Sequence, residues 1–408
     1  MKCRHCGADV TLSFVDLGTA PPSNAYLSRE MLNAPDKWYP LRVLTCEECW
    51  LVQTNDVAHF AELFSSDYAY FSSYSTTWLK HSEDYVAEMV QRYGLGPASF
   101  HIEVAANDGY LLQYSKARGI PCLGIEPTAG TAGAARSKGI EIVEEFFNTK
   151  VAERLVSADR HADLMTANNV LAHVPDINDF LAGFSMLLKP AGVATFEFPH
   201  LLNLVDRNEF DTVYHEHFSY FSLCALRRIF ESAGLSIFDV EELPTHGGSL
   251  RLFAQRRETG RRLGTGRVEN VIAREIGAGL EKAEYYKSFQ EKADKVKNDL
   301  LRFLLDAKSK GRRVSGYGAA AKGNTLINYA GIRQDLIPFV ADKSPRKQGK
   351  YLPGSRIPIV DESVLRAYKP DFVVVFPWNL EEEITEQLLY IREWGGRFVV
   401  AVPALEIR

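Results

Sequence analysis

The sequence predicts an α/β protein with a small metal-binding domain, a central domain containing a mostly parallel sheet of about seven strands, and a second α/β domain. Three observations predict this architecture. Short apolar strands alternate with helical segments between residues 100 and 255, as in a parallel sheet covered by helices. Two Cys-x-x-Cys pairs lie within the first 50 residues, and a second strand, glycine turn and helix follow residue 312.

The composition is that of a globular protein of two or three domains. The 408 residues are 46% hydrophobic and 24% charged. We divide the chain into a metal-binding domain (1–62), a central domain (63–260), a helical connector (261–310) and a C-terminal domain (311–408). The net charge of −5 disfavours a nucleic-acid partner. Because no signal peptide or membrane-length apolar run is visible, we expect a cytoplasmic protein without a membrane partner.

Four cysteines near the N-terminus form the most specific motif. Cys3-x-x-Cys6 and Cys46-x-x-Cys49 are separated by 39 residues. Four thiolates at such spacing suit a tetrahedral zinc ion. No general base or open ligand position is evident nearby, so we predict a structural Zn2+ in a domain too small to be held by its core alone. Cys122 and Cys224 lie in apolar surroundings and are interpreted as packing residues.

Residues 64–77 are rich in aromatic and hydroxyl side chains and lack a clear period. They suit either a loop that covers a polar ligand or a surface linker, and the composition does not decide between these. The spacing of apolar residues from Trp78 to Tyr93 predicts a helix.

The first strand of the central sheet is predicted at residues 100–105, followed by a small-residue turn at 106–109 and a helix over 110–117. This order opens many nucleotide-binding α/β folds, because the helix N-terminus offers free N–H groups. The second strand, 122–125, ends at Glu126, where a carboxylate can accept hydrogen bonds from ribose hydroxyls. The turn contains only one glycine, Gly109. The alternative to a nucleotide-binding fold is therefore an ordinary α/β protein that has a carboxylate at this strand end.

Further strands are predicted at 140–143, 162–169, 193–198, 235–240 and 249–255, with a helix over 177–188. Ligands bind at the carboxyl ends of parallel strands. The polar residues and the proline at these ends are Asn107, Asp108, Glu126, Asn168, Asn169, Glu197 and Pro199. The turn at 245–249 either lines the same pocket or only connects two strands.

The C-terminal third begins after a charged helix or helix pair over 268–309, whose Tyr285 and Tyr286 are interpreted as packing residues. A glycine turn spans 316–324, and strands are predicted at 336–341, 372–376 and 398–402. Four lysines fall near these strand ends: Lys322, Lys343, Lys347 and Lys350. They suit a diphosphate, although a solvated lysine-rich loop has the same composition.

Residues 210–220, FDTVYHEHFSY, concentrate groups that can move protons. In a core, each of these polar groups would need a hydrogen-bond partner, because a buried group without one costs about 1–3 kcal/mol of stability. We therefore interpret Tyr214, Glu216 and His217 as members of a reactive site, with a buried polar cluster as the alternative. His215 is expected to be structural, because sequence neighbours seldom face the same pocket.

Five motifs in this order resemble the sugar C-methyltransferases of deoxysugar biosynthesis, known from antibiotic pathways. They are the paired Cys-x-x-Cys motifs, Glu103-x-Ala-Ala-Asn107-Asp108-Gly109, Asn168-Asn169-x-x-x-His173, Tyr214-His215-Glu216-His217 and Gly316-Tyr317-Gly318-x-x-x-Lys322-Gly323-Asn324. The resemblance covers essentially the whole chain. It implies a zinc-bearing N-terminal domain, a central class I methyltransferase domain with a seven-stranded sheet, and a C-terminal Rossmann-like domain that helps bind the nucleotide sugar.

The resemblance also implies ligands and site residues. The cofactor is S-adenosylmethionine and the substrate a nucleotide-linked keto sugar, by default a dTDP-linked 4-keto sugar methylated at C-3′. The implied cofactor residues are Glu103, Ala105, Asn107, Asp108, Gly109, Glu126, Pro127, Phe147 and Asn168. The implied substrate residues are Asn169, Tyr317, Lys322, Asn324, Lys343 and Lys347. Ala105 and Ala106 depart from the glycine-rich loop of methyltransferases at large, which leaves the placement of the methionine end of the cofactor open.

The implied catalytic residues are Tyr74, His173, Tyr214, Glu216 and His217, with His217 as general base. A ketone beside the reacting carbon allows loss of a proton to give an enolate, the carbon nucleophile that methylation requires. Histidine has a suitable pKa, and we expect Glu216 to orient it or raise its basicity. Tyr74 or Tyr214 can donate a hydrogen bond to the enolate oxygen. His173 either orients the substrate or caps a helix.

Two other functions fit parts of the sequence. A nicotinamide-dependent sugar-nucleotide oxidoreductase or epimerase suits two α/β domains with glycine turns, but G-x-G-x-x-G is absent after the first strand. An RNA methyltransferase with a zinc ribbon suits the cysteine pairs, but not the acidic pI of about 6.1. The sequence does not determine the sugar, the nucleotide base, the stereochemical outcome or the oligomeric state; a monomer is one of the states we allow.

Overall fold

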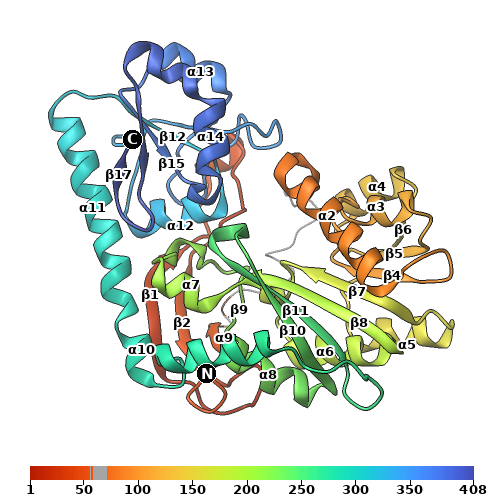
Figure 1. The fold of residues 1–408 in the computed structure, drawn as a ribbon. Helices are drawn as coiled ribbons and strands as arrows, with labels where there is room; N and C mark the ends of the chain where they lie inside the picture. Colours follow the sequence, from red (N-terminus) through yellow and green to blue (C-terminus); the bar gives the residue numbers. More distant parts are fainter. Residues whose placement is uncertain (56, 58–70) are drawn as a thin grey trace.

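The computed structural model describes residues 1–55, 57 and 71–408, and three sheets organise the chain (Figure 1). The loop predicted at residues 64–77 is described only from Phe71 onward, so its first part lies outside the described residues.

The N-terminal sheet has four strands in the order β1-β2-β3-β9. Its first three strands come from the predicted metal-binding segment: β1 (Leu12–Ala20), β2 (Tyr39–Thr45) and β3 (Val52–Thr54). The fourth, β9 (Ser219–Tyr220), comes from the end of the predicted reactive stretch and pairs antiparallel with β3, with Val52 opposite Tyr220. A segment about 165 positions away in the sequence therefore completes this sheet, which local patterns did not predict.

The four cysteine sulfurs lie together beside the N-terminal sheet. Their Sγ atoms all lie within 4.8 Å of one another, with Cys3 to Cys49 at 3.5 Å and Cys6 to Cys46 at 3.6 Å. A tetrahedral zinc ion with Zn–S bonds of about 2.3 Å requires sulfur separations of about 3.8 Å. The four thiolates thus fit zinc.

The central sheet has seven strands in the order β10-β11-β8-β7-β4-β5-β6. The first five in sequence are parallel, whereas β11 pairs antiparallel with β8 and with β10. The predicted mostly parallel seven-stranded sheet is confirmed. The strands are β4 (His101–Val104), β5 (Cys122–Ile125), β6 (Glu141–Val143), β7 (Ala162–Asn168), β8 (Leu188–Pro199), β10 (Leu235–Leu243) and β11 (Ser249–Arg256).

Helices flank this sheet, and several begin at side-chain caps that the sequence supplies. Ser75, Asn148, Asp176 and Ser222 each accept a hydrogen bond from a backbone N–H in the first turn of the following helix. The helices are α2 (Thr76–Tyr93), α3 (Leu112–Ala117), α4 (Ala129–Ser137), α5 (Thr149–Ser157), α6 (Ile177–Leu187), α7 (Leu201–Asp206) and α8 (Leu223–Ser232).

The C-terminal sheet has the strand order β14-β13-β12-β15-β16-β17, which is Rossmann-like. The strand predicted at 336–341 is too long, because β13 covers only Val340–Ala341 and Pro338 has no N–H to donate to a ladder. The other elements are β12 (Val314–Tyr317), α12 (Ala321–Tyr329), β14 (Ile359–Val360), α13 (Glu362–Tyr368), β15 (Phe372–Val375), α14 (Glu381–Gln387), β16 (Arg397–Val400) and β17 (Glu406–Ile407).

The connector consists of α9 (Gly266–Ala278), α10 (Ala283–Lys287) and α11 (Phe289–Ser309), and α11 runs from the N-terminal sheet to the C-terminal domain (Figure 1). Phe289 stacks on Phe14 of β1 with ring centroids 4.5 Å apart, and Tyr286 is buried, as predicted for a packing residue. One hydrophobic cluster joins the N-terminal sheet, the connector and the C-terminal domain. No helix among the described residues is both long and apolar enough to cross a bilayer.

Loss of one sulfur ligand is expected to loosen β9 as well as the cysteine loops. In a Cys46→Ser variant the bound metal per chain and the melting temperature should both fall, because a structural zinc ion contributes folding free energy. Hydrogen exchange at Ser219 and Tyr220 should rise, because β3 follows Cys49 closely and pairs with them. Cys122→Ser, outside the cluster, is the control. Unchanged exchange at β9 in a metal-depleted variant would contradict this coupling.

Candidate active site

The carboxyl ends of β4, β5, β7 and β8 meet at one edge of the central sheet, and the loop after β4 is folded tightly there. Ala105 and Asn107 have φ values of +55° and +48°, and Gly109 has +75°. Side chains rarely adopt this left-handed region, and such strain gathers at functional sites. A Cβ at Gly109 would lie 2.5 Å from Ile140 Cδ1, so helix and strand pack closely here.

Glu126, at the end of β5, holds this loop in place. One carboxylate oxygen accepts a hydrogen bond from the backbone N–H of Asn107 at 2.9 Å, and the other accepts from Thr128 N and Thr131 Oγ1, both at 2.9 Å. The oxygen that accepts from Asn107 has capacity for one further donor. The carboxylate directly follows β5 at the carboxyl edge of the sheet, and its binding of a ribose stays a prediction. Pro127, next in the chain, is half-buried.

The described part of the aromatic loop lies against the same turn. Ser72 N donates to Asn107 Oδ1 at 3.0 Å, and Ser73 Oγ donates to Asp108. The second oxygen of Asp108 is buried and has no hydrogen-bond partner among the described residues. Ser72 and Ser73 thus lie against the turn after β4, and whether the loop covers a ligand stays a prediction.

Glu103 and Phe147 lie deeper than the other predicted cofactor residues. Glu103 is fully buried in β4, and burial raises its pKa well above the ordinary value, which keeps the carboxyl protonated. Phe147 packs edge-on against Phe180 and Phe184 of α6. Both therefore support the floor of the site from within the core.

Asn168 ends β7 with a buried side chain, and neither its amide nitrogen nor its amide oxygen has a hydrogen-bond partner in the part of the chain that the structure describes. A buried amide without partners is costly unless a ligand supplies them. The next residue, Asn169, donates to His246 Nε2 at 3.3 Å. His246 belongs to the turn at 245–249, so this turn also lines the site.

The predicted reactive stretch forms a β-turn closed by a hydrogen bond from His217 N to Tyr214 O at 2.9 Å. The Tyr214 hydroxyl lies 2.7 Å from His217 Nε2, and His217 Nδ1 lies 2.8 Å from the carbonyl oxygen of Thr212. A carbonyl can only accept, so Nδ1 carries the proton and Nε2 accepts from the tyrosine. The structure thus leaves Nε2 as the basic nitrogen.

His217 and His173 form a pair, with ring centroids 4.7 Å apart. Burial, with the nearby His173, lowers the pKa of His217 well below its ordinary value, and burial lowers the pKa of His173 to about 4. Both imidazoles are therefore neutral at pH 7. His173 ends a short 3₁₀ turn (Leu171–His173) instead of starting a helix, and the backbone of Glu216 bonds to its ring.

The expected contact between Glu216 and His217 is absent from the described hydrogen bonds, and Glu216 faces a different partner. Both of its carboxylate oxygens accept from Asn24 Nδ2 at 2.8 Å. The Thr212 carbonyl, rather than this carboxylate, orients His217. The reason is turn geometry: adjacent side chains leave the backbone in different directions. His215 is structural, as predicted, since its Nε2 lies 3.2 Å from Pro40 O.

Tyr74 is the predicted catalytic residue that the structure does not bring to this turn. Its side chain is 54% exposed and stacks on Phe71, with ring centroids 5.7 Å apart. Its segment contacts the loop after β4 instead. Tyr214, His217 and His173 are the predicted catalytic side chains that lie together.

A buried network at the end of β8 was not predicted beyond the strand-end position of Glu197. His81 Nε2 lies 3.0 Å from the Glu197 carboxylate, and Arg251 lies 3.3 Å from it. Burial opposes ionisation of Glu197, but His81 and Arg251 outweigh it and lower the carboxyl pKa. Trp78 stacks on His81 and lies 6.0 Å from the ring of Tyr110. The network holds α2 over the edge of the sheet. In the sequence, the only sign of it was His81 within the predicted helix.

Lys322 occupies the junction of the central and C-terminal domains. Its Nζ lies 3.0 Å from Asn379 Oδ1 and 4.0 Å from the centre of the Trp378 ring. Two buried carboxyl groups lie near it: burial raises the pKa of Glu209 to about 8 and that of Asp211 to about 6, although the lysine opposes both shifts. Trp378 Nε1 donates to Asp211 at 2.9 Å. Asp211 belongs to the predicted reactive stretch, whereas sequence patterns gave no signal for Glu209 and Trp378.

The other predicted substrate residues of the C-terminal domain are dispersed. Lys347 Nζ lies 2.8 Å from Ala319 O, and Lys343 is exposed. Tyr317 is buried in the domain's own core, where its hydroxyl accepts from Gln387 at 2.7 Å. Asn324 is 1% exposed, and its Nδ2 has no hydrogen-bond partner among the described residues. Lys322 and Lys347 therefore bind different partners beside the glycine turn, and whether the lysines hold a diphosphate stays a prediction.

The glycines of the C-terminal turn serve packing. A Cβ at Gly318 would lie 2.4 Å from Pro377, and one at Gly316 would lie 2.6 Å from Phe376. Asp342, at the ribose position after β13, already accepts from Ala319 N and Ser344 N.

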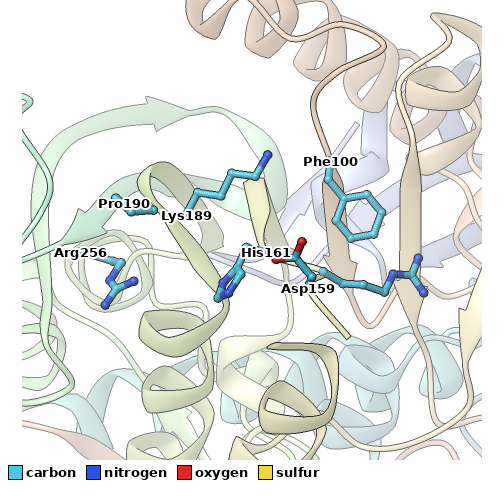
Figure 2. A pocket seen from close by; sticks show the side chains of 7 residues that line it. Phe100, Asp159, His161, Lys189, Pro190 and Arg256 are labelled. Atoms are coloured by element: carbon cyan, nitrogen blue, oxygen red, sulfur yellow. The ribbon is translucent and has the colours of Figure 1, made fainter. Parts of the chain in front are cut away.

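A cavity of about 550 Å3 opens at the opposite edge of the central sheet, near the amino ends of β4 and β7 (Figure 2). Two of its cations are already paired: Arg160 binds Glu141 through two contacts of 2.6 and 2.7 Å, and Lys189 binds Asp163 at 2.7 Å. The strained loop after β4 and the unpartnered Asn168 amide lie at the other edge. The carboxyl edge is therefore the candidate site.

Family models match three consecutive parts of the chain. A zinc binding domain matches residues 3–64, a methyltransferase domain 78–240 and a C-methyltransferase C-terminal domain 244–403. The residues of the site fit these matches. The strained loop, the Glu126 carboxylate and the unpartnered Asn168 amide suit S-adenosylmethionine, and the four thiolates suit zinc.

The C-methyltransferase NovU of Streptomyces niveus is 34% identical over 402 residues, which are 98% of this chain and 95% of the relative. Among solved structures, an S-adenosylmethionine-dependent methyltransferase from Clostridium acetobutylicum covers 46% of this chain and 92% of its own, at 14% identity and a TM-score of 0.35. Magnesium protoporphyrin IX methyltransferase from Synechocystis covers 44% and 79%, at 16% identity and 0.33. Those two scores are too low to inform function. The full-length match to NovU is decisive: the chain belongs to the sugar C-methyltransferase family, whose members use S-adenosylmethionine and carry zinc.

Proposed function

We propose that this enzyme methylates C-3′ of a dTDP-linked 4-keto deoxysugar after removing a proton from that carbon. The observation that carries the proposal is the Tyr214 hydroxyl lying 2.7 Å from a neutral His217, with His173 against the histidine ring. His173 lies five residues beyond Asn168, at the cofactor edge of the sheet. A proton-accepting nitrogen beside a methyl-donor site is what carbon methylation requires.

The chemistry assigned to His217 follows from its hydrogen bonds. Its Nδ1–H is held by the Thr212 carbonyl, so Nε2 accepts the proton that leaves the sugar carbon. For Nε2 to take that proton, the Tyr214 hydroxyl must turn from Nε2 to the substrate oxygen. The electrons of the C–H bond then form the enolate, whose oxygen receives the hydrogen bond from Tyr214. Bound S-adenosylmethionine supplies an electrophilic methyl group for the enolate carbon.

The amino end of α12 is our proposed site for the diphosphate. A helix N-terminus attracts anions, and here Lys322 and the unpartnered Asn324 amide nitrogen, judged among the described residues, adjoin it. Thr325 Oγ1 of the same helix donates to Val213 O at 2.9 Å, just before the Tyr214–His217 turn. The choice of thymidine and of position 3 follows the family resemblance.

We assign the parts of the chain as follows. Residues 1–62 hold the zinc ion, 63–260 bind the methyl donor and carry the base, 261–310 connect, and 311–408 help bind the nucleotide sugar. We place the enzyme in the cytoplasm, where sugar nucleotides and reduced thiolates are available. A monomer contains every residue that the proposed reaction uses.

Replacing the proposed base should abolish turnover without abolishing binding. For His217→Asn we expect kcat to fall on the order of a hundredfold or more, since general-base catalysis contributes that much. His215→Asn, in the same turn but bonded to Pro40, is the matched control and should lose far less activity. Methyl transfer from labelled S-adenosylmethionine measures both variants. Turnover near the wild-type rate in the His217→Asn variant with substrate bound would place the base elsewhere.

The pH dependence should carry the signature of a depressed histidine pKa. Burial lowers the pKa of His217 below 6.5, so the basic form is present throughout neutral pH and is lost only on acidification. We expect the acidic limb of kcat/KM to lie below pH 6.5, because kcat/KM reports the free enzyme. A limb near pH 8 that disappears in Glu209→Gln would instead assign control to that carboxyl group.

Removing the lysine charge at α12 should weaken nucleotide binding. For Lys322→Met we expect the Kd for dTDP to rise roughly tenfold, the loss of one charge-assisted hydrogen bond. Lys310→Met, an exposed residue at the end of α11, makes the same change in net charge and should leave the Kd unchanged. Calorimetry measures both constants. Equal Kd values for the two variants would move the diphosphate away from α12.

A further inference from the structure

The segment between β1 and β2 belongs to the zinc-binding part of the chain and contacts the Tyr214–His217 turn. Asn24, in this segment, donates its amide hydrogens to both oxygens of Glu216 at 2.8 Å. Glu216 is 1% exposed, and Asn24 is half-buried. A contact between a neutral amide and a buried carboxylate is a charge-assisted hydrogen bond, roughly twice as strong as one between neutral groups.

A series of contacts continues from Asn24 to the C-terminal domain. The hydroxyl of Tyr26 lies 3.4 Å from Asn24 Oδ1 and donates to Ala319 O at 2.7 Å. Lys347 Nζ donates to the same carbonyl at 2.8 Å, and its charge lies 5.5 Å from the centre of the Tyr26 ring. Because the single hydroxyl proton of Tyr26 goes to Ala319 O, Tyr26 only contacts Asn24 Oδ1, and the short hydrogen bonds of Asn24 are those to Glu216.

Glu216 is the third residue of the turn that carries the proposed base. The turn closes from His217 N to Tyr214 O, and the backbone of Glu216 bonds to the ring of His173. A displaced Glu216 side chain would therefore tilt the turn and move both histidines. Misplacement of reacting groups by about 1 Å can cost about a hundredfold in rate.

We propose that Asn24 is a positioning residue of the methyl-transfer site, which fixes the Tyr214–His217 turn through the carboxylate of Glu216. The inference rests on the proposed role of His217 and extends it to a segment outside the methyltransferase domain. Asn24 acts on the reaction without touching the reacting atoms.

A second polar contact from the same segment provides a matched control. Asp36 accepts from Gly354 N at 3.0 Å and pairs with Arg356 at 2.9 Å, joining this segment to the C-terminal domain without involving residues 214–217. If the reaction only requires the segment between β1 and β2 to be attached to the rest of the protein, loss of Asp36 and loss of Asn24 should lower kcat to a similar extent. If Asn24 positions the turn, only its loss should lower kcat.

The experiment compares Asn24→Ala, Asn24→Asp, Asp36→Ala, Glu216→Gln and the double variant Asn24→Ala/Glu216→Gln in the methyl-transfer assay. For Asn24→Ala we expect kcat to fall on the order of tenfold or more, with KM for the sugar nucleotide within about twofold. Asn24→Asp keeps the shape but opposes the carboxylate, so it should lose more. The double variant should be no slower than Glu216→Gln alone. Melting temperature and zinc content identify any variant that does not fold.

Three results would overturn the inference: Asn24→Ala as active as Asp36→Ala, Asn24→Asp more active than Asn24→Ala, or losses that multiply in the double variant. Asn24→Asp is nearly isosteric and so remains informative if the alanine variant does not fold. If the wild-type enzyme itself fails to methylate the dTDP-linked 4-keto sugar, the proposed substrate is wrong. By contrast, if the wild-type enzyme is active and an Asn24 variant has a normal rate, the proposed substrate stands and only the role of Asn24 is wrong.

Discussion

The pairing of β3 with β9 is the interaction on which the site depends. β3 begins three residues after Cys49, and its Thr54 donates its N–H to Phe218 O at 3.1 Å and its hydroxyl to His217 O at 3.2 Å. The main chain of the proposed base is thus held by the strand that the zinc cluster fixes. The cysteine cluster and the proposed base are thus linked through one short strand.

Burial sets the protonation states around this turn. Neutral imidazoles at His173, His217 and His246 all result from desolvation of the charged form, which lowers each pKa. The carboxyl groups of Glu209 and Asp211 are pushed the other way, toward the protonated form, while Lys322 remains between them. The same desolvation strengthens hydrogen bonds made at this turn, including the one proposed to the enolate oxygen.

Local sequence patterns predicted most of the fold and part of the site. Strand ends such as Glu126 and Asn168 could be found because the βα alternation places them at one edge, and the four cysteines because their spacing is metal-specific. The partner of Glu216 could not, since Asn24 lies about 190 positions away and nothing in its neighbourhood distinguishes it from other loop asparagines. Contacts between distant segments leave no local pattern. For this reason the sequence did not predict β9, a two-residue strand defined by its pairing with β3, or the grouping of Glu209 and Asp211 with Lys322.

The Tyr214–His217 turn is secured from segments spread over most of the chain. Asn24 holds Glu216, Thr54 holds His217, Thr325 holds Val213 and Trp378 holds Asp211. During synthesis on the ribosome these partners emerge one after another, and Trp378 emerges about 120 residues after β11, the last strand of the central sheet. The central sheet is therefore synthesised in full before the Tyr214–His217 turn has all of its partners. The proposed proton acceptor is held in place only after the central domain has been made.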